Sequence, residues 1–367
     1  MIKERDSRFE MLRIVSMIMI ILHHMALYTG MIDSKQLSVQ AIGELILIGG
    51  KIGCFIFVIL TGYYSTINIQ SITMQGIKAW LAASFYGLTL AVIFKAMGEQ
   101  IGIKDIIKGA LPISGGGYWF LTAYLGMLFC APCVTYMIDV FNTKQLKTVG
   151  TLAIIVNILI PTVCVRINPF SNTVMLFCLY YAVGVLIRRK MIMTDVKKPF
   201  LKAMCIIIVV YFIQMVLCIW GRKYPAIYNS RNWLSGNNSL FIMIATVFIF
   251  VACTHMKKIA NRTINTLAAP AFGVYLLHDN VWVRDLLWSQ CFSMNFIEKQ
   301  NSVSLFVELV GIAIVLYMIC ATIEVIREKL FNWLLFSHFN SSCLEYIYGR
   351  VKGRCTDYLG EGFGNRK

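Results

Sequence analysis

Long apolar runs constrain this chain more than any other feature of its sequence. A helix needs about 20 mostly apolar residues to cross a bilayer. Runs of that length predict ten spans, at about 11–31, 42–63, 78–98, 118–137, 149–166, 172–188, 200–220, 240–256, 267–289 and 304–326. They are too long for the strands of a β-barrel and lack the alternation of such strands. We therefore expect an all-α, polytopic membrane helix bundle of about ten transmembrane helices.

The composition excludes a soluble protein. Only 14% of the 367 residues are charged and 58% are hydrophobic, whereas soluble domains carry about 25% charged residues. The net charge of +16 would suggest a nucleic-acid partner in a soluble protein. Here the basic residues cluster in short loops between the apolar runs. We therefore expect contact with the lipid bilayer and no nucleic-acid binding.

The distribution of Lys and Arg predicts the orientation. With residue 1 in the cytoplasm, the segments expected inside hold about two thirds of the 34 Lys and Arg residues, as the positive-inside rule requires. An even number of spans then returns the chain to the same side. We expect a multi-pass protein of the plasma membrane with both termini in the cytoplasm, and a basic cytoplasmic tail at 327–367.

The twelve cysteines lie mostly inside the apolar runs. The CAPC sequence at Cys130 and Cys133 also falls within a predicted span. Free thiols that pack as small hydrophobic groups fit this distribution better than disulfides do. We expect no metal site.

Three groups of polar residues interrupt the apolar runs, where charges are costly and usually mark function. In the first group, Glu10 and Arg13 each lie within about 40° of His24 around a helix, with His23 off this stripe. The rise from Arg13 to His24 is about 16 Å, so Arg13 lies near the cytoplasmic mouth and His24 beyond mid-membrane. His24 is a candidate general base. The alternative is a His hydrogen-bonded in the core, with a snorkelling Arg.

The second group is Glu44 and Lys51, which share one face of the second span. A structural ion pair or a snorkelling Lys is the simplest interpretation. The third group surrounds His278 in the span 267–289, where Asp279 cannot face the same way as its immediate neighbour His278. His278 could hold a substrate hydroxyl or orient a partner, and a hydrogen bond between helices is the alternative.

These segments resemble the acyltransferase 3 family, integral-membrane acyltransferases that modify cell-surface polysaccharides. Arg13 and His24 match the family's Arg-x10-His, GGKIGCFIFVILTGYYS at 49–65 matches its GG-K-I-G…F…SGY, and AFGVYLLH at 271–278 matches its (S/A)FG-(I/V)-YL-x-H. YWFLTAYLGMLFCAP at 118–132 is similar to its W-(Y/F)-L…Y…P span. The resemblance covers about 8–326, which we expect to be a membrane acyltransferase domain.

Two residues depart from the family pattern. Thr61 replaces the usual Ser of SGY and keeps its hydroxyl, and Phe55 stands where relatives often carry Asp or Asn. We expect no extracellular hydrolase-like domain of the kind that some members carry. Two options therefore stay open: this chain completes the transfer alone, or a partner acyltransferase in the envelope does so.

The resemblance implies a reaction and roles for the polar residues. An acyl-CoA, most simply acetyl-CoA, would serve as co-substrate with no bound cofactor. Its phosphates would meet Arg13, with Arg188 and Arg189 as looser candidates. His24 would deprotonate a hydroxyl or carry the acyl group, and Glu10 would orient Arg13. The acceptor, a cell-surface glycan or its lipid-linked precursor, would contact residues from three spans: His278, Lys51, Trp119 and Tyr124.

A membrane exporter or flippase of a polysaccharide or small molecule is the alternative function. Ten spans, interior charges and glycine-rich helices fit it as well. The sequence shows no inverted repeat and no paired broken helices, which transporters often have. This favours the acyltransferase.

Overall fold

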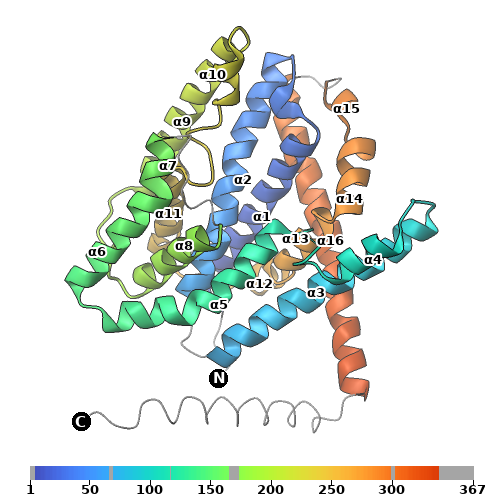
Figure 1. The fold of residues 1–367 in the computed structure, drawn as a ribbon, viewed down its shortest axis with the longest axis horizontal. Coiled ribbons are helices and arrows are strands. Elements are labelled where there is room, and N and C mark those ends of the chain that lie inside the picture. Colours follow the sequence, from blue (N-terminus) through green and yellow to red (C-terminus); the bar gives the residue numbers. More distant parts are fainter. Residues whose placement is uncertain (1–4, 66–68, 116, 165–172, 299–301, 339–367) are drawn as a thin grey trace. The chain divides into compact units, whose positions relative to one another are not determined.

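The computed structural model describes residues 5–65, 69–115, 117–164, 173–298 and 302–338. These residues form helices and no strand (Figure 1). Seven helical segments are long and apolar enough to cross a membrane. They are α1 (Ser7–Tyr28), α2 (Leu37–Tyr63), α3 (Ile69–Ala96), α5 (Trp119–Val140), the segment Thr143–Val163, α9 (Pro199–Gly221) and α16 (Ser302–His338). The expected all-α polytopic bundle is confirmed.

The predicted number of ten crossings is not confirmed. Two further apolar helices, α8 (Thr173–Arg188) and α11 (Leu240–His255), have 16 residues each, or about 24 Å. The segment Thr143–Val163 consists of α6 (Thr143–Ile154), η2 (Ile155–Leu159) and α7 (Ile160–Val163). The remaining elements are short: η1 (Met31–Asp33), α4 (Ile103–Ala110), α10 (Pro225–Asn229), α12 (Arg262–Ala268), α13 (Ala271–His278), α14 (Val281–Asp285), η3 (Leu286–Cys291) and α15 (Met294–Glu298).

The predicted span 267–289 is not one helix, so this expectation was wrong. Pro270 separates α12 from α13, because proline cannot donate a backbone hydrogen bond within a helix. A second break follows α13, where Asn280 adopts an extended conformation and caps α14 by accepting from the Trp282 backbone N–H. The functional residues of this segment therefore lie at a helix end.

The chain forms two compact units that meet between Cys320 and Ala321. The packing and the site described below belong to the first unit. In the predicted tail 327–367, residues 327–338 continue α16, and 339–367 lie outside the described residues. Residues 165–172, which hold one end of each of two predicted spans, also lie outside them.

The start of α1 is fixed by a buried arginine. Arg8 is 5% exposed, and its guanidinium donates to the carbonyls of Thr254 (3.0 Å) and Met256 at the end of α11. A cation is favourable there because the last carbonyls of a helix lack partners. Arg8 also pairs with Asp6 at 2.6 Å, and its hydrogen bond lowers the pKa of the Asp6 carboxyl. One of the basic residues near the chain start is thus structural.

A widened helical turn at η2 has an identifiable cause. Pro161 has no N–H to donate toward the carbonyl of Asn157, four residues earlier. The side-chain amide of Asn238 donates to that carbonyl instead, at 2.8 Å. This bond satisfies a backbone group that would otherwise be orphaned in an apolar surrounding.

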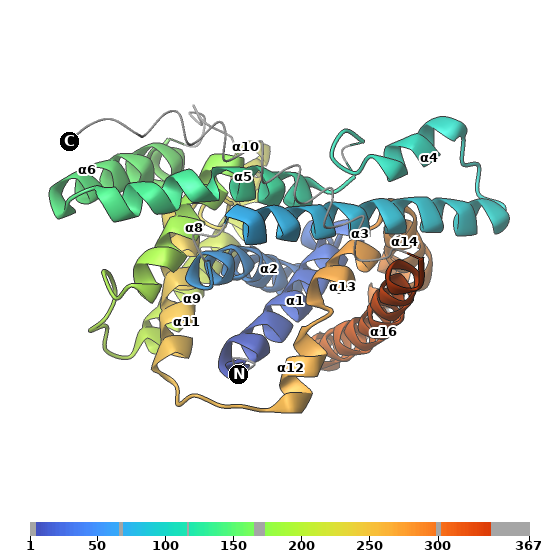
Figure 2. The same ribbon diagram turned by 90° about the horizontal axis from the view of Figure 1, so that it is seen from below.

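α1 and α2 pack closely and lie inside a ring of other helices, with α8, α9 and α11 on one side and α12 and α13 on another (Figure 2). Glycines of α2 make the close approach to α1. A Cβ at Gly53 would lie 2.6 Å from the Ser16 carbonyl oxygen, and one at Gly50 would overlap His23 Cβ. A Cβ at Gly49, by contrast, would meet only the flexible side chain of Met19, with Sδ nearest at 3.7 Å.

Two adjacent glycines therefore predict opposite effects of the same substitution. Gly50→Ala is expected to destabilise the protein by about 1–3 kcal/mol, because α1 and His23 must move to make room. Gly49→Ala is expected to be neutral or to stabilise by about 0.5–1 kcal/mol, since alanine favours the helix. Thermal unfolding in one detergent measures both. Equal melting temperatures for the two variants would contradict the close packing at Gly50.

Candidate active site

Two histidines from distant parts of the sequence meet inside the bundle. His24 on α1 and His278 at the end of α13 are 5% and 0% exposed. His24 Nδ1 lies 2.9 Å from His278 Nε2, and the ring centroids are 5.1 Å apart. The sequence identified both residues but in separate groups. Of the interpretations considered for His278, the structure shows the hydrogen bond between helices, and its partner is His24.

The hydrogen bonds fix the tautomers of this pair. His278 Nδ1 lies 2.7 Å from the Val274 carbonyl, which can only accept, so His278 Nδ1 carries a proton. In neutral His278, Nε2 then holds a lone pair and accepts from His24 Nδ1–H. The proton of neutral His24 is therefore on Nδ1, and its Nε2 is left with a lone pair. A lone pair on Nε2 is what a general base requires.

Asp279 completes this group, contrary to the expectation that it faces away from His278. The expectation was wrong because α13 ends at His278, and Asp279 is its C-cap. The chain turns there, which brings Asp279 Oδ1 to 3.6 Å from His24 Nδ1. Asp279 is 2% exposed and also accepts from the Tyr28 hydroxyl at 3.4 Å. A buried carboxylate thus stands beside the imidazole and can stabilise it when it is protonated.

His24 opens onto a cavity of about 180 Å³ between α1, α2, α5 and α13. The lining is mostly apolar, with a few polar groups that include Lys51, Tyr28 and Asn237. Trp119, a predicted acceptor contact, also lines it. The predicted stripe excluded His23, yet His23 lines the cavity too and donates to the Leu47 carbonyl at 3.0 Å. The cavity is wider than one helical stripe.

Glu10 and Arg13 lie together but do not line this cavity. They form an ion pair of 2.7 Å, as their spacing predicts, with Glu10 buried and Arg13 27% exposed at its side chain. The α1 lining of the cavity begins at Met17, one turn beyond Arg13. The structure therefore does not place Glu10, Arg13 and His24 in one cavity, although the cavity reaches the same face of α1.

Tyr124, another predicted acceptor contact, lies outside the His24 cavity. Its hydroxyl contacts Thr61 Oγ1 at 3.2 Å and accepts from Gln75 at 2.5 Å. The hydroxyl kept at Thr61 thus has a defined partner. Phe55 stacks on Tyr180 at 4.1 Å, which makes this departure from the family a packing residue.

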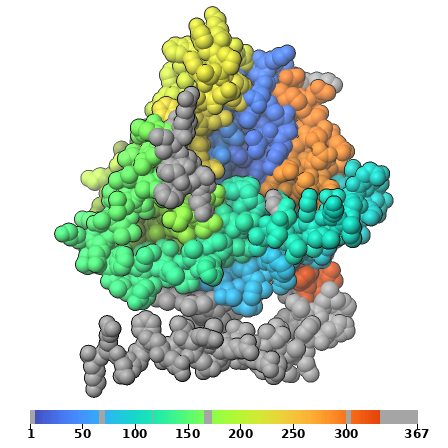
Figure 3. Space-filling view, viewed as in Figure 1, coloured from blue at the N-terminus to red at the C-terminus, as the bar shows by residue number. Residues whose placement is uncertain are grey.

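Glu44 and Lys51 do not form an ion pair with each other. Glu44 is fully buried and accepts from Arg231 Nε at 2.9 Å and from Gln214. Arg231 also binds Asp33 at 2.6 Å. Through Arg231, Glu44 joins α2 to the 221–239 segment. The surface of this segment lies next to the blue surface of α1 and α2 in Figure 3. Sequence reasoning missed Arg231, which lies in a polar loop without a pattern. Lys51 instead lines the His24 cavity.

The two looser donor candidates have different surroundings. Arg188 is exposed and lies 5.2 Å from the ring centroid of Tyr63, which in turn packs on Phe9 of α1. Arg189 pairs with Asp139 at the surface. Arg188 thus lies near the start of α1, where Arg13 is, and Arg189 has its own partner.

Sequence reasoning also missed Tyr28, which lies one turn after His24 and could have been found by the same spacing. Its ring centroid is 5.5 Å from that of His24. Its hydroxyl accepts from Arg284 at 2.9 Å. Tyr28, Asp279 and Arg284 thus form a polar network on one side of the histidine pair.

The comparisons with known proteins identify the family. The family model for the acyltransferase 3 domain, described as an acyltransferase domain, matches residues 6–325. No curated protein and no solved structure matched the chain. The matched region contains the histidine pair, the cavity and the Glu10–Arg13 ion pair. The chain belongs to the acyltransferase 3 family and is a membrane acyltransferase.

Proposed function

We propose that this acyltransferase moves an acetyl group from acetyl-CoA to a hydroxyl of a cell-surface polysaccharide or of its lipid-linked precursor. The observation that carries the proposal is the buried His24, whose Nδ1 donates to His278 and whose Nε2 keeps a lone pair. A hydroxyl is a weak nucleophile at neutral pH and needs such a base. The exporter alternative offers no use for this fixed tautomer.

The reaction balances on these residues. The acceptor hydroxyl oxygen attacks the thioester carbon while His24 Nε2 takes the hydroxyl proton. The carbon–sulfur bond then breaks, and the imidazolium returns its proton to the CoA thiolate. Asp279, 3.6 Å from His24 Nδ1, stabilises the imidazolium between these steps. The products are an ester and free CoA.

The donor enters from the side of Arg13, which we propose is the cytoplasmic side of the plasma membrane, with both termini on that side. Acetyl-CoA is charged and cannot cross a bilayer, and guanidinium groups suit its phosphates. The face of α1 rises about 16 Å from Arg13 to His24, which the extended arm of the donor would span. Arg188 near the start of α1 is a second phosphate contact.

The size of the cavity supports a short acyl group. Its volume of about 180 Å³ is smaller than the about 300–1,000 Å³ of pockets for drug-sized ligands. A thioester with a two-carbon acyl group needs little space, whereas a long chain needs more. This favours acetyl over fatty acyl groups.

The test uses the purified chain in proteoliposomes with labelled acetyl-CoA on one side and a polysaccharide or its lipid-linked precursor on the other. We expect label in an ester of the acceptor and free CoA on the donor side. Movement of intact glycan without ester formation would support the exporter alternative and contradict our proposal. Ester formation only after addition of an envelope fraction would show that a partner acyltransferase is required.

Arg13 provides a second measurement in the same assay. Arg13→Gln is expected to raise the KM for acetyl-CoA by about 10–100-fold with little change in kcat, since a charge-assisted hydrogen bond contributes about 1.5–3 kcal/mol. Arg262→Gln is the matched control, because Arg262 is exposed and lies near Ser7 at the start of α1. Equal KM values for the two variants would remove Arg13 from the donor site.

A further inference from the structure

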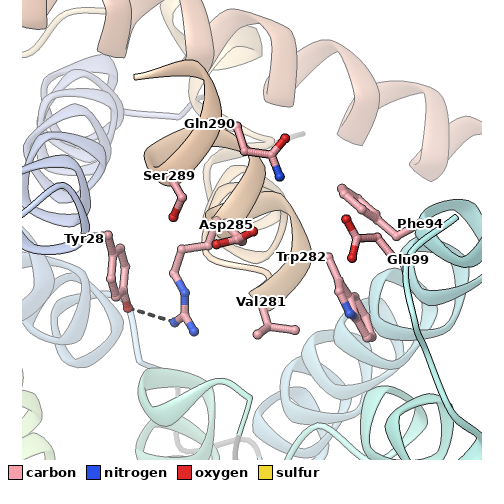
Figure 4. A pocket seen from close by; sticks show the side chains of 9 residues that line it. Tyr28, Phe94, Glu99, Val281, Trp282, Asp285, Ser289 and Gln290 are labelled. Atoms are coloured by element: carbon pink, nitrogen blue, oxygen red, sulfur yellow. Dashed lines mark hydrogen bonds between the residues drawn. The ribbon is translucent and has the colours of Figure 1, made fainter. Parts of the chain in front are cut away.

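A second cavity, of about 390 Å³, lies beside the His24 site, between the ends of α1 and α3 and the 281–290 segment. Figure 4 shows Tyr28 on one side of it and Trp282, Phe94 and Glu99 on the opposite side, with Ser289 and Gln290 between them. Its volume is in the range of small-molecule sites. The reaction derived above gives this cavity no role.

Its lining combines an aromatic face with hydrogen-bonding groups. Trp282 packs against the apolar cluster of Ala91, Phe94 and Ile101 and also lines the cavity. The face of an aromatic ring is electron-rich and attracts the weakly positive C–H groups of a sugar ring. The carboxylates of Glu99 and Asp285 are acceptors only, so they suit hydroxyl groups, which donate. This chemistry is that of a polyhydroxylated ring.

The charges of the lining favour an uncharged ligand. Two carboxylates, those of Glu99 and Asp285, face a single cation, Arg284. Arg284 is already engaged, since it donates to the Tyr28 hydroxyl at 2.9 Å and lies 3.8 Å from Asp279. Among the described residues, neither Glu99 nor Asp285 has an ion-pair partner. An acidic sugar would therefore meet two like charges.

Tyr28 joins the two cavities. It lines both of them, and its ring centroid lies 5.5 Å from that of His24. The dashed line in Figure 4 marks its bond to Arg284. A sugar bound in the second cavity would thus be one side chain away from the base.

We propose that this cavity binds an uncharged sugar residue of the acceptor glycan, with its ring on Trp282 and its hydroxyls on Glu99 and Asp285. The sugar that reacts is its neighbour in the same glycan, which reaches His24 past Tyr28. This inference rests on the proposed function, because it supplies the acceptor of that reaction. It adds a substrate class, a neutral rather than an acidic sugar, and the residues that select it.

The test measures binding of methyl glucoside and of methyl glucuronide to the full chain in nanodiscs by saturation-transfer NMR. Trp282→Leu is expected to weaken glucoside binding by about tenfold, and Trp282→Phe by less than about threefold, because phenylalanine keeps an aromatic face. Trp220→Leu, the matched control on α9 with Trp220 64% exposed, leaves binding unchanged. Glu99→Gln with Asp285→Asn raises glucuronide binding relative to glucoside binding by about fivefold.

Two outcomes would overturn the proposal. Wild-type protein that binds the glucuronide as tightly as the glucoside contradicts the charge argument. Trp282→Leu that behaves like Trp220→Leu contradicts the placement of the ring. Acetyl-CoA binding, and ester formation on the polysaccharide or its lipid-linked precursor, are measured on the same protein preparations. Sugar binding that depends on Trp282, without ester formation on any hydroxyl, would contradict the proposed function and support the sugar site.

Discussion

Replacing His24 by Asn is expected to lower the kcat of acyl transfer by about 10²–10⁴-fold, the range for loss of a general base. The Asn amide nitrogen can occupy the position of His24 Nδ1 and keep the hydrogen bond to His278 Nε2, which is 2.9 Å long in the structure. The Asn side chain has no atom at the position of His24 Nε2, the nitrogen that takes the proton. The variant therefore keeps the contact that holds α1 to α13 and removes only the base. The measurement is ester formation with saturating acetyl-CoA, beside thermal unfolding in the same detergent.

His23→Asn is the matched control for this variant. His23 is the adjacent residue, and its Nδ1 donates to the Leu47 carbonyl, a bond that the Asn amide can also make. It contacts neither His278 nor Asp279 through a hydrogen bond among the described residues. We expect its kcat to stay within about tenfold of wild type. If the two variants lose activity equally, His24 has no special role as base.

Replacing His278 is expected to lower kcat by an amount that depends on which ring nitrogen the new side chain imitates. Asn can donate to the Val274 carbonyl but does not reach His24. Gln reaches the position of Nε2 and offers an oxygen that accepts from His24 Nδ1–H. We expect a loss of about 10–100-fold for His278→Asn, the range for residues that orient a functional ligand, and a smaller loss for His278→Gln. The KM for acetyl-CoA should not change in either variant.

The order of these two variants separates orientation from packing. His278 is fully buried, so both substitutions disturb the core, and a packing role would make them equally harmful or favour the smaller Asn. If His278 acts by fixing the tautomer of His24, a side chain that places a hydrogen-bond acceptor at the position of His278 Nε2 restores part of the kcat. Equal kcat values for His278→Asn and His278→Gln would contradict the tautomer argument.

Local periodicity in the sequence predicted the bundle and most of the polar residues that matter. Helix length and apolar character are properties of one segment, so the membrane helices could be recognised without knowing their neighbours. The Glu10–Arg13 ion pair was equally local, because residues three apart meet on any helix. His24 and His278 stood out because polar side chains are costly in lipid.

Helical angles, however, give a direction and not a depth. Glu10, Arg13 and His24 share a direction, yet the cavity begins one turn beyond Arg13. A continuous helix also predicted the wrong direction for Asp279. Where α13 ends, 100° per residue no longer applies, and the turn brings His278 and Asp279 to the same imidazole.

The sequence by itself determined an all-α membrane protein of the acyltransferase 3 family and the identity of its two histidines, because these depend on short-range patterns. Only the tertiary structure decided which side chains meet. His24 and His278 are 254 residues apart, and Glu44 finds Arg231 rather than Lys51. Contacts of this kind follow from how whole helices pack and where they break, and no local pattern in a single sequence encodes the partner.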